Sequence, residues 1–318
     1  MICNGRSFAA KLGDQTTLGL SLSHSGWRAF KGGFDRHRRK LRHRLLEPML
    51  VGRPTLRGTV MRALAARGHL ILCDLGCQRM FVDPSDRAIG DALIWRGAYQ
   101  RDEFDRALAL LVAAGRLPPK TVFLELGANI GTHTVYAMRS GHFASAVVFE
   151  PEPHNARLLA MNVDINAFAD RVTVVEKAAG AAPGRAVMHL HPRNKGAHAI
   201  GFAPADDGLD QVEIAVVRPD EVLRDLGVAL ADIGLVWMDT EGYEPHALVG
   251  LGEIVTRGVP IAFEFFPARY EAAVKRDVVQ LLATHYTCMC RLAQPGRCEP
   301  TPVEALANIE GREDVLVY

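Results

Sequence analysis

One stretch, Thr121–Arg139, constrains the fold of this chain more than any other. It begins with an apolar run that ends at Glu125-Leu126, passes through Gly127-Ala128-Asn129-Ile130-Gly131, and then has the pattern of a helix. Small residues in the turn let backbone approach a ligand closely, and the start of the helix offers N–H groups for a polar or anionic group. The stretch therefore predicts a strand, a glycine turn and a helix that together form a ligand site.

The spacing of this turn differs from that of a dinucleotide site. Glu-x-Gly-x-x-x-Gly stands in place of Gly-x-Gly-x-x-Gly, and Gly127 is alone where a pyrophosphate needs close approach. A carboxylate just before the glycine, here Glu125, suits a cationic ligand such as the amino-acid end of S-adenosylmethionine. The spacing argues against a dehydrogenase, although a turn of this kind can also be purely structural.

Composition indicates an ordinary globular protein. The chain has 318 residues, 48% of them hydrophobic and 23% charged, with a formal net charge of +1. It shows no apolar run of the ~18 residues that would suggest a membrane span. Its start lacks the basic-then-apolar layout of a signal peptide, so we expect a cytoplasmic protein. The six cysteines are too few for a disulfide scaffold, and free thiols are expected.

The segment Trp27–Arg67 has an unusual charge. It holds twelve Lys and Arg residues against two acids, Asp35 and Glu47. Such a segment can bind nucleic acid or anionic lipid. From Arg36 to Arg67 no Phe, Trp or Tyr interleaves with the arginines, so we favour a helical extension that pairs with the acidic body or with a second subunit of a homo-oligomer.

From residue 121 onward, strands and helices alternate. This alternation predicts a parallel sheet covered by helices, with ligands at the carboxyl ends of the strands. Gly68–Pro84 is expected to form a hairpin and Asp102–Gly115 a helix. The later expected strands are 145–150, 171–176, 186–190, 212–217, 233–238, 260–265, 286–292 and 314–318, and the expected helices are 132–139, 153–168, 219–226, 244–256 and 268–284.

Acidic residues follow the predicted strands. Glu150 ends the second strand, 23 residues after Gly127, where a carboxylate can accept hydrogen bonds from both hydroxyls of a ribose. Asp239 and Glu241 follow a buried strand and precede Gly242. Two acids at such a place are costly unless a ligand or a metal uses them.

These motifs resemble the FkbM-type family of S-adenosylmethionine-dependent methyltransferases. The matching stretches, in the family's order, are LELGANIGTHT (124–134), VVFEPEPHNARLL (147–159), VVRPDEVLRDLG (216–227), VWMDTEGYEPHALVG (236–250) and PIAFEFFP (260–267). The resemblance implies a class I methyltransferase with a Rossmann-like α/β fold. We expect a mostly parallel seven-stranded sheet with helices on both faces and an antiparallel C-terminal strand. The expected domains are a basic extension (1–67), a hairpin and helical brace or lid (68–120) and the methyltransferase domain (121–318).

The resemblance also implies roles for individual residues. Asp239 and Glu241 would face the methyl group and the acceptor, although Trp237-Met238 replaces the Lys-x that the family more often has before this motif. The loop 191–210 would recognise the acceptor, for which we expect Asn194, Lys195, His198 and His246 as contacts. The predicted cofactor site comprises Glu125, Gly127, Asn129, Gly131, Glu150, Glu176, Lys177 and Ala178.

The expected reaction is O-methylation of a small-molecule or glycan hydroxyl, with S-adenosylmethionine as cofactor. Asp239 is the first candidate for the base and Glu241 the second, ahead of His133 and His198. Two carboxylates alone do not fill a coordination shell, so no metal is expected. Two alternatives stay open: an RNA methyltransferase that uses the basic segment, and a non-catalytic nucleotide-binding module. The first lacks the Asp/Asn-Pro-Pro-aromatic motif of base N-methylation, and the intact acids argue against the second.

Overall fold

The computed structural model describes residues 54–201, 209–293 and 299–318. The chain divides into two units, Met1–Val60 and Met61–Tyr318. Most of the predicted basic extension, residues 1–67, lies outside the described residues, and its described part holds helix α3, Pro54–Ala65.

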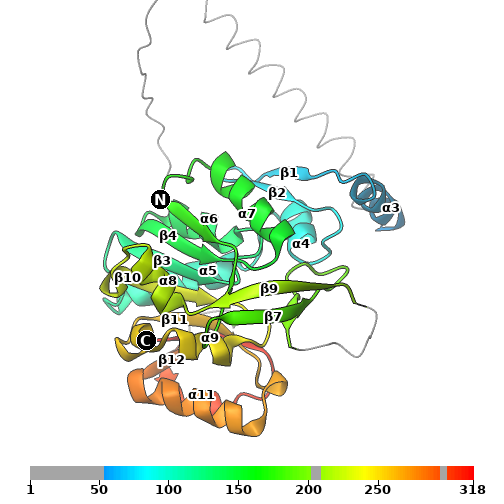
Figure 1. The fold of residues 1–318 in the computed structure, drawn as a ribbon. Coiled ribbons are helices and arrows are strands. Elements are labelled where there is room, and N and C mark those ends of the chain that lie inside the picture. The colour runs from blue at the N-terminus through cyan, green and yellow to red at the C-terminus, as the bar shows by residue number, and fades with distance from the viewer. Residues whose placement is uncertain (1–53, 202–208, 294–298) are drawn as a thin grey trace, which may run out of the picture. The chain divides into compact units, whose positions relative to one another are not determined.

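The second unit is built on a mostly parallel sheet (Figure 1). Within the described residues this sheet has eight strands in the order β13-β12-β14-β11-β10-β3-β4-β5. The five strands from β11 to β5 are parallel, and β14, β12 and β13 are antiparallel to their neighbours. The bounds are β3 Thr121–Leu126, β4 Phe143–Phe149, β5 Val172–Val175, β10 Ile233–Met238, β11 Ile261–Phe265, β12 Cys288–Arg291, β13 Thr301–Pro302 and β14 Glu313–Val317.

The predicted α/β fold and the antiparallel C-terminal strand are confirmed, but the predicted count of seven strands is one too low. The eighth strand is β13, a two-residue segment that pairs with β12 at the edge of the sheet. Two residues are too few to show a strand pattern in the sequence. The proline also argues against a strand there, because proline is tolerated only at the edge of a sheet.

Helices cover both faces of the sheet, because alternate strand residues point to opposite sides. Phe123, Val148 and Trp237 belong to one buried cluster, with α5, α6 and α7, and Leu124, Phe149 and Met238 to the other, with α9, α10 and α11. The helices are α4 Ile89–Arg96, α5 Arg101–Ala113, α6 Thr132–Ser140, α7 Pro153–Ile165, α8 Pro219–Asp225, α9 Glu244–Gly250, α10 Gly252–Thr256 and α11 Ala272–His285. Three short 3-10 turns add η1 Leu230–Asp232, η2 Pro267–Arg269 and η3 Val303–Asn308.

Two helical segments differ from the prediction. Helix α4 lies in the region 85–101, for which the sequence pattern predicted no element. The single helix predicted over 244–256 is broken at Leu251, whose φ of −89° and ψ of 20° end α9 and begin α10.

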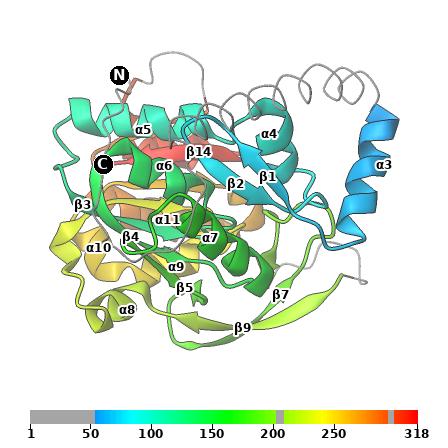
Figure 2. The same cartoon turned by 90° about the horizontal axis from the view of Figure 1, so that it is seen from above.

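The predicted N-terminal hairpin is present as β1, Ile71–Asp74, and β2, Arg79–Val82, and it packs on α7 (Figure 2). The Asn162 amide donates to the Phe81 carbonyl and accepts from the Phe81 N–H, at 3.1 and 2.6 Å. Asn166, one turn later, does the same with Arg79. The two side-chain amides make the backbone hydrogen bonds that a neighbouring strand would otherwise make to β2, and they hold the hairpin to α7.

The predicted strands 186–190 and 212–217 pair with each other, but in a separate four-stranded sheet. Its order is β6-β9-β7-β8, with bounds β6 Ala178–Ala179, β7 Gly184–His189, β8 Ala199–Ile200 and β9 Gln211–Val217. Strands β6 and β9 are parallel, and the other pairs are antiparallel. This small sheet places the loop 191–201 near the carboxyl ends of the main strands.

The chain reverses direction across the main sheet between β3 and β10. After β3 it proceeds through β4 to β5, and it later returns to form β10 on the other side of β3. Crevices outside the carboxyl ends of such neighbouring strands are the usual ligand sites of open parallel sheets. Among the described residues, no helix has the length and apolarity to cross a membrane.

Candidate functional site

A cavity opens at the carboxyl ends of β3, β4 and β10. It encloses about 900 Å³, its open mouth included. Its walls come from the turn after β3, the residues after β4 and β10, the small sheet, and Tyr99 before α5. Of the predicted site residues, those that line it are Gly127, Asn129, Glu150, Lys177, Ala178, Asn194, Lys195, His198, Asp239 and Glu241.

The turn after β3 requires its glycines. Gly127 has a φ of +84°, and a Cβ there would lie 1.9 Å from the carbonyl oxygen of Asp239. Gly131 has a φ of +82°, and its Cβ would lie 2.4 Å from Leu159 Cδ1 on α7. Gly127 thus joins β3 to β10 at the cavity, whereas Gly131 packs α6 on α7 and does not line the cavity.

The backbone N–H groups at residues 127 to 131 are used within the protein. Those of Gly127 and Ala128 both donate to the Phe149 carbonyl at 2.9 Å, and that of Asn129 donates to Glu150 Oε2 at 2.7 Å. The next two donate to Asn129 Oδ1 and to the Ala128 carbonyl. These N–H groups therefore fix the shape of the turn. The expectation that N–H groups at the start of α6 hold a ligand stays a prediction.

Glu125 lies behind the cavity wall and is fully buried. Its Oε2 accepts a hydrogen bond from the Thr134 hydroxyl, and its Oε1 lies 3.6 Å from His133 Nδ1. His133 itself lines the cavity among the rings of Tyr99, Phe104 and Trp237. Glu125 thus supports the cavity through His133 and the start of α6.

Glu150 is buried at the end of β4 and faces the cavity. Its carboxylate accepts from the N–H of Asn129 at 2.7 Å and from the N–H of Glu152 at 2.9 Å. Burial raises the pKa of Glu150 to about 8, although both hydrogen bonds favour the charged form. Each carboxylate oxygen keeps a lone pair for a further donor. Of the neighbouring predicted residues, Lys177 and Ala178 line the cavity, whereas Glu176 is exposed outside it.

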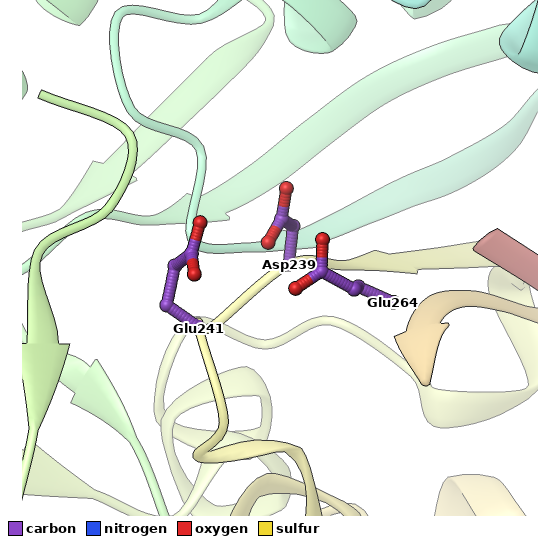
Figure 3. Close-up of side chains that lie close together, drawn as sticks. All are labelled: Asp239, Glu241 and Glu264. Atoms are coloured by element: carbon purple, nitrogen blue, oxygen red, sulfur yellow. The ribbon is translucent and has the colours of Figure 1, made fainter. Parts of the chain in front are cut away.

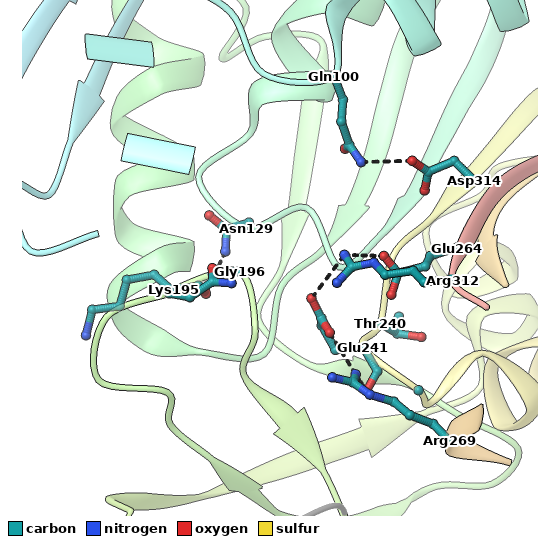
Figure 4. Close-up of polar contacts among 12 residues, drawn as sticks. Gln100, Asn129, Lys195, Gly196, Thr240, Glu241, Glu264, Arg269, Arg312 and Asp314 are labelled. Carbon is teal, nitrogen blue, oxygen red and sulfur yellow. Dashed lines mark hydrogen bonds and ion pairs between the residues drawn. The ribbon is translucent and has the colours of Figure 1, made fainter. Parts of the chain in front are cut away.

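The loop after β7 is fastened across the glycine turn (Figure 4). The carbonyl oxygen of Lys195 accepts from the amides of Asn129 at 2.8 Å and Asn155 at 3.1 Å. The N–H of Arg87 donates to the Arg193 carbonyl on the far side of the loop, at 2.7 Å. Asn129 therefore bonds both to Glu150, through its backbone, and to this loop, through its side chain.

His198 is buried in the same wall. Its Nδ1 accepts a hydrogen bond from the His191 N–H at 2.9 Å. Burial, reinforced by the charge of Lys195, lowers the pKa of His198 to about 4. The ring is thus neutral near pH 7 and carries its proton on Nε2. His198 offers the cavity one hydrogen-bond donor of fixed identity.

Three carboxylates converge at the ends of β10 and β11 (Figure 3). Oxygens of Asp239, Glu241 and Glu264 lie within 4.8 Å of one another. Arg312 pairs with Glu264 and lies 3.7 Å from Glu241, and Arg269 donates to the Glu241 carboxylate at 2.7 Å (Figure 4). Among the described residues, Asp239 has no hydrogen-bond or ion-pair partner for its side chain. It is the one carboxylate of the three without a cation of its own.

The loop after β10, which carries Asp239 and Glu241, is braced by Glu244. Glu244 Oε1 accepts from the N–H and hydroxyl of Thr240, both at 2.9 Å, and from the N–H of Gly242 at 3.2 Å. Its Oε2 accepts from the Tyr270 hydroxyl at 2.8 Å. Glu241 sits at a φ of +53°, a conformation that favours glycine, and Arg269 also holds its carbonyl, at 2.5 Å. Strain of this kind persists only where its surroundings impose it.

His246 lies outside the cavity. It is exposed and stacks on the ring of Tyr243, with centroids 4.4 Å apart and planes 6° apart. Tyr243 is the member of this pair that lines the cavity. A substrate role for His246 stays a prediction. Because His246 lies outside the cavity, its effect on a substrate would have to be exerted through Tyr243.

Sequence reasoning missed several residues of the site. Glu264 was visible as a lone acid inside the apolar strand IAFEF, where an unpaired charge is costly. Asn155 lies in the stretch 147–159 without a role that the stretch indicates, and Arg312 and Tyr99 carry no motif. They reach the cavity from segments far apart in the sequence, so local pattern does not reveal them.

The strand order, the switch point between β3 and β10 and the cavity at the carboxyl ends define the class I methyltransferase fold. Solved structures of similar fold include a precorrin-6y C5,15-methyltransferase from Geobacter metallireducens, with 14% identity, 66% of this chain and 86% of that chain covered, and a TM-score of 0.34. Another is an RNA methyltransferase from Salinibacter ruber in complex with S-adenosyl-L-homocysteine, with 14% identity, coverages of 52% and 76%, and a TM-score of 0.31. At these TM-scores we draw no argument about function from them.

The sequence supplies the family. The family model described as "Methyltransferase FkbM domain" matches residues 125–286, and the chain belongs to this family. Methyltransferase activity and S-adenosylmethionine as methyl donor follow from this membership. A search of curated proteins gives no match.

Proposed function

We propose that the protein transfers a methyl group from S-adenosylmethionine to a hydroxyl oxygen of a sugar, glycan or secondary metabolite, with Asp239 as the base. The observation that carries this proposal is the Asp239 carboxylate, which lines the cavity without a hydrogen-bond or ion-pair partner among the described residues. Such a group is costly to keep unless a ligand uses it. The proposal covers the acceptor class and the residue roles, beyond what family membership gives.

Several features of the cavity support binding of the methyl donor. Only glycine is tolerated at residue 127, because a Cβ there would lie 1.9 Å from the carbonyl oxygen of Asp239, so the turn stays close to β10. We propose that the Glu150 carboxylate holds the ribose hydroxyls, and that Lys177 and Ala178 lie against the adenine. When bound, S-adenosylmethionine supplies an electrophilic methyl group on a positively charged sulfur.

Asp239 is a better base than Glu241. The carboxylate of Glu241 accepts a hydrogen bond from Arg269 and lies near Arg312, so its charge is already balanced. A hydroxyl proton moving to Glu241 would disrupt these pairs. A proton moving to Asp239 disrupts none. Asp239 can therefore take the proton of an acceptor hydroxyl that lies within hydrogen-bond reach.

The loop after β7 and Tyr99 support binding of a polyhydroxylated acceptor. His198 presents a hydrogen-bond donor, and Asn194, Lys195 and Tyr99 line the same cavity. The Lys195 carbonyl is clamped by Asn129 and Asn155, so this loop is held in place beside the cofactor turn. We propose that these groups orient the acceptor hydroxyl toward Asp239.

The test is the Asp239→Asn variant, which keeps the size of the side chain but removes its ability to take a proton. We expect it to keep binding S-adenosylmethionine in calorimetry, and NAD to bind neither protein. In a deletion strain, the wild-type gene should restore a methylated glycan or metabolite seen by mass spectrometry, and the Asp239→Asn gene should not. Full restoration by the variant would remove Asp239 as the base. A missing methyl group on RNA, with glycans and metabolites unchanged, would favour the RNA alternative instead.

A further inference from the structure

The three carboxylates of the site do not share their cations equally. Asp239 follows β10, and Glu264 is the last residue but one of β11. Because Met238 pairs with Phe263 in the parallel register, Asp239 and Glu264, the next residues along the two chains, lie side by side. Arg312 contacts Glu264 and Glu241, and Arg269 contacts Glu241. Two guanidinium groups therefore serve three carboxylates, and Asp239 is the one left over.

The surroundings of Asp239 do not supply the positive charge that its carboxylate lacks. Glu264 is 1% exposed and Glu241 is 5% exposed, so bulk water does not screen them well. The titratable and charged groups that face Asp239 are Glu264, Glu241, Asp314 of β14, Arg312 and Tyr99, with His133 in the same cavity wall. Three of these six groups are carboxylates, and one is a guanidinium.

Carboxylates this close in a site of low dielectric resist being ionised together, and burial with the charge of Glu241 also raises the pKa of Glu264, to about 8. A proton on the cluster is held most firmly where no cation stabilises the carboxylate charge. Glu264 and Glu241 have arginine partners, so Asp239 is the favoured position. Burial, together with the charges of Glu264 and Glu241, accordingly raises the pKa of Asp239 well above its usual range.

We propose that Asp239 is protonated in the free enzyme and releases this proton to solvent when a positively charged ligand enters the cavity. Asp239 would thereby become able to act as a base only in the complex with the methyl donor. The inference rests on the proposed function, because it requires the sulfonium charge to lie close to Asp239. The balance is simple: one O–H bond of Asp239 dissociates, the proton goes to buffer, and the carboxylate charge offsets the ligand's positive charge.

The experiment compares two ligands that differ at the sulfur. S-Adenosylmethionine carries a sulfonium, and S-adenosylhomocysteine carries a neutral thioether on the same adenosine and amino-acid groups. Calorimetric titrations at about pH 6.5, below the pKa of an α-amino group, in buffers of different ionisation enthalpy give the protons released per site for each ligand. We expect S-adenosylmethionine to release more protons than S-adenosylhomocysteine, by up to about one per site.

Two variants test the source of the proton. Asp239→Asn should bind both ligands and lose the difference in proton release. Glu264→Gln removes a neighbouring negative charge and should reduce the difference without abolishing it. Below the pKa of Asp239, the ratio of the two affinities should rise with pH by up to about tenfold per unit in the wild type and stay flat in Asp239→Asn.

The outcomes separate the inference from the proposed function. Equal proton release by the two ligands, or a difference that persists in Asp239→Asn, would overturn the inference and leave the methyltransferase assignment intact. Failure of both ligands to bind the wild type would instead contradict the proposed cofactor site.

Discussion

Replacing Gly127 by alanine should damage both the stability and the cofactor site of the enzyme. The added Cβ would lie 1.9 Å from the Asp239 carbonyl oxygen, whereas ordinary contact begins at 3.4 Å. Since Gly127 follows β3 and Asp239 follows β10, the new methyl group must push two neighbouring strand ends apart. The displaced backbone carries the proposed base.

The magnitude follows from two costs. An alanine at a φ of +84° has a strained backbone, which costs roughly 1–2 kcal/mol. Overpacking against a carbonyl that belongs to the central sheet costs roughly a further 1–3 kcal/mol. We therefore expect Gly127→Ala to lower the free energy of unfolding by roughly 2–5 kcal/mol and to weaken binding of S-adenosylmethionine.

Gly141 provides a matched control at the other end of α6. Its φ is +77°, and a Cβ there would meet nothing within 4 Å. Gly141→Ala should thus lose only the backbone part, roughly 1–2 kcal/mol, and bind S-adenosylmethionine as the wild type does. Urea unfolding and calorimetry measure the two effects. Equal losses of stability in the two variants, with unchanged affinity in both, would refute the argument that Gly127 is required by its contact with Asp239.

Three further predictions concern the charged groups. The folded-state pKa of Glu150, raised by burial from 4.5 to about 8, means that the folded protein holds a proton that the unfolded chain has lost. Stability from this group should therefore fall as pH rises from about 5 to 8, by up to ~1.4 kcal/mol per pH unit, and Glu150→Gln should remove that part of the slope in urea unfolding. Arg269→Met removes a partner of the buried Glu241 and should cost roughly 2–4 kcal/mol of unfolding free energy. Because guanidinium groups already balance two of the three clustered carboxylates, methyl transfer should survive dialysis against EDTA.

Each of these predictions has a contrary result. The pH argument fails if wild type and Glu150→Gln show parallel stability profiles. For Arg269, the control is Arg185→Met, which breaks an exposed pair with Glu213 and should change stability by no more than ~0.5 kcal/mol. A similar small effect at both arginines would mean that Glu241 does not depend on Arg269. Activity lost in EDTA and restored by magnesium would show that a metal takes part.

The sequence predicted the elements of the main sheet because their signals are local. Apolar runs such as 121–126 and 233–238 stand out as buried strands, and the residues that follow them, including Glu150 and Asp239, can be identified as strand ends. Parallel strands bring their carboxyl ends to one edge, so the proximity of these acids also followed from pattern alone.

The partners of those acids were not predictable in this way. Arg312 and Glu264 are 48 residues apart in the sequence, and the stretch 260–267 that contains Glu264 does not indicate Arg312 as its partner. Strand register and the antiparallel return of β14 bring them together. The same holds for Lys195, whose carbonyl is clamped by two amides from distant elements.

The chain by itself therefore determined the fold class, the glycine turn and the two acids after β10, since hydrophobic period and glycine spacing are read within one segment. Tertiary structure alone decided which carboxylates have a cation and which does not, because ion pairs depend on distances that no local pattern encodes. That distribution leaves Asp239 without a partner at the cavity, and it is the physical basis of the proposed chemistry.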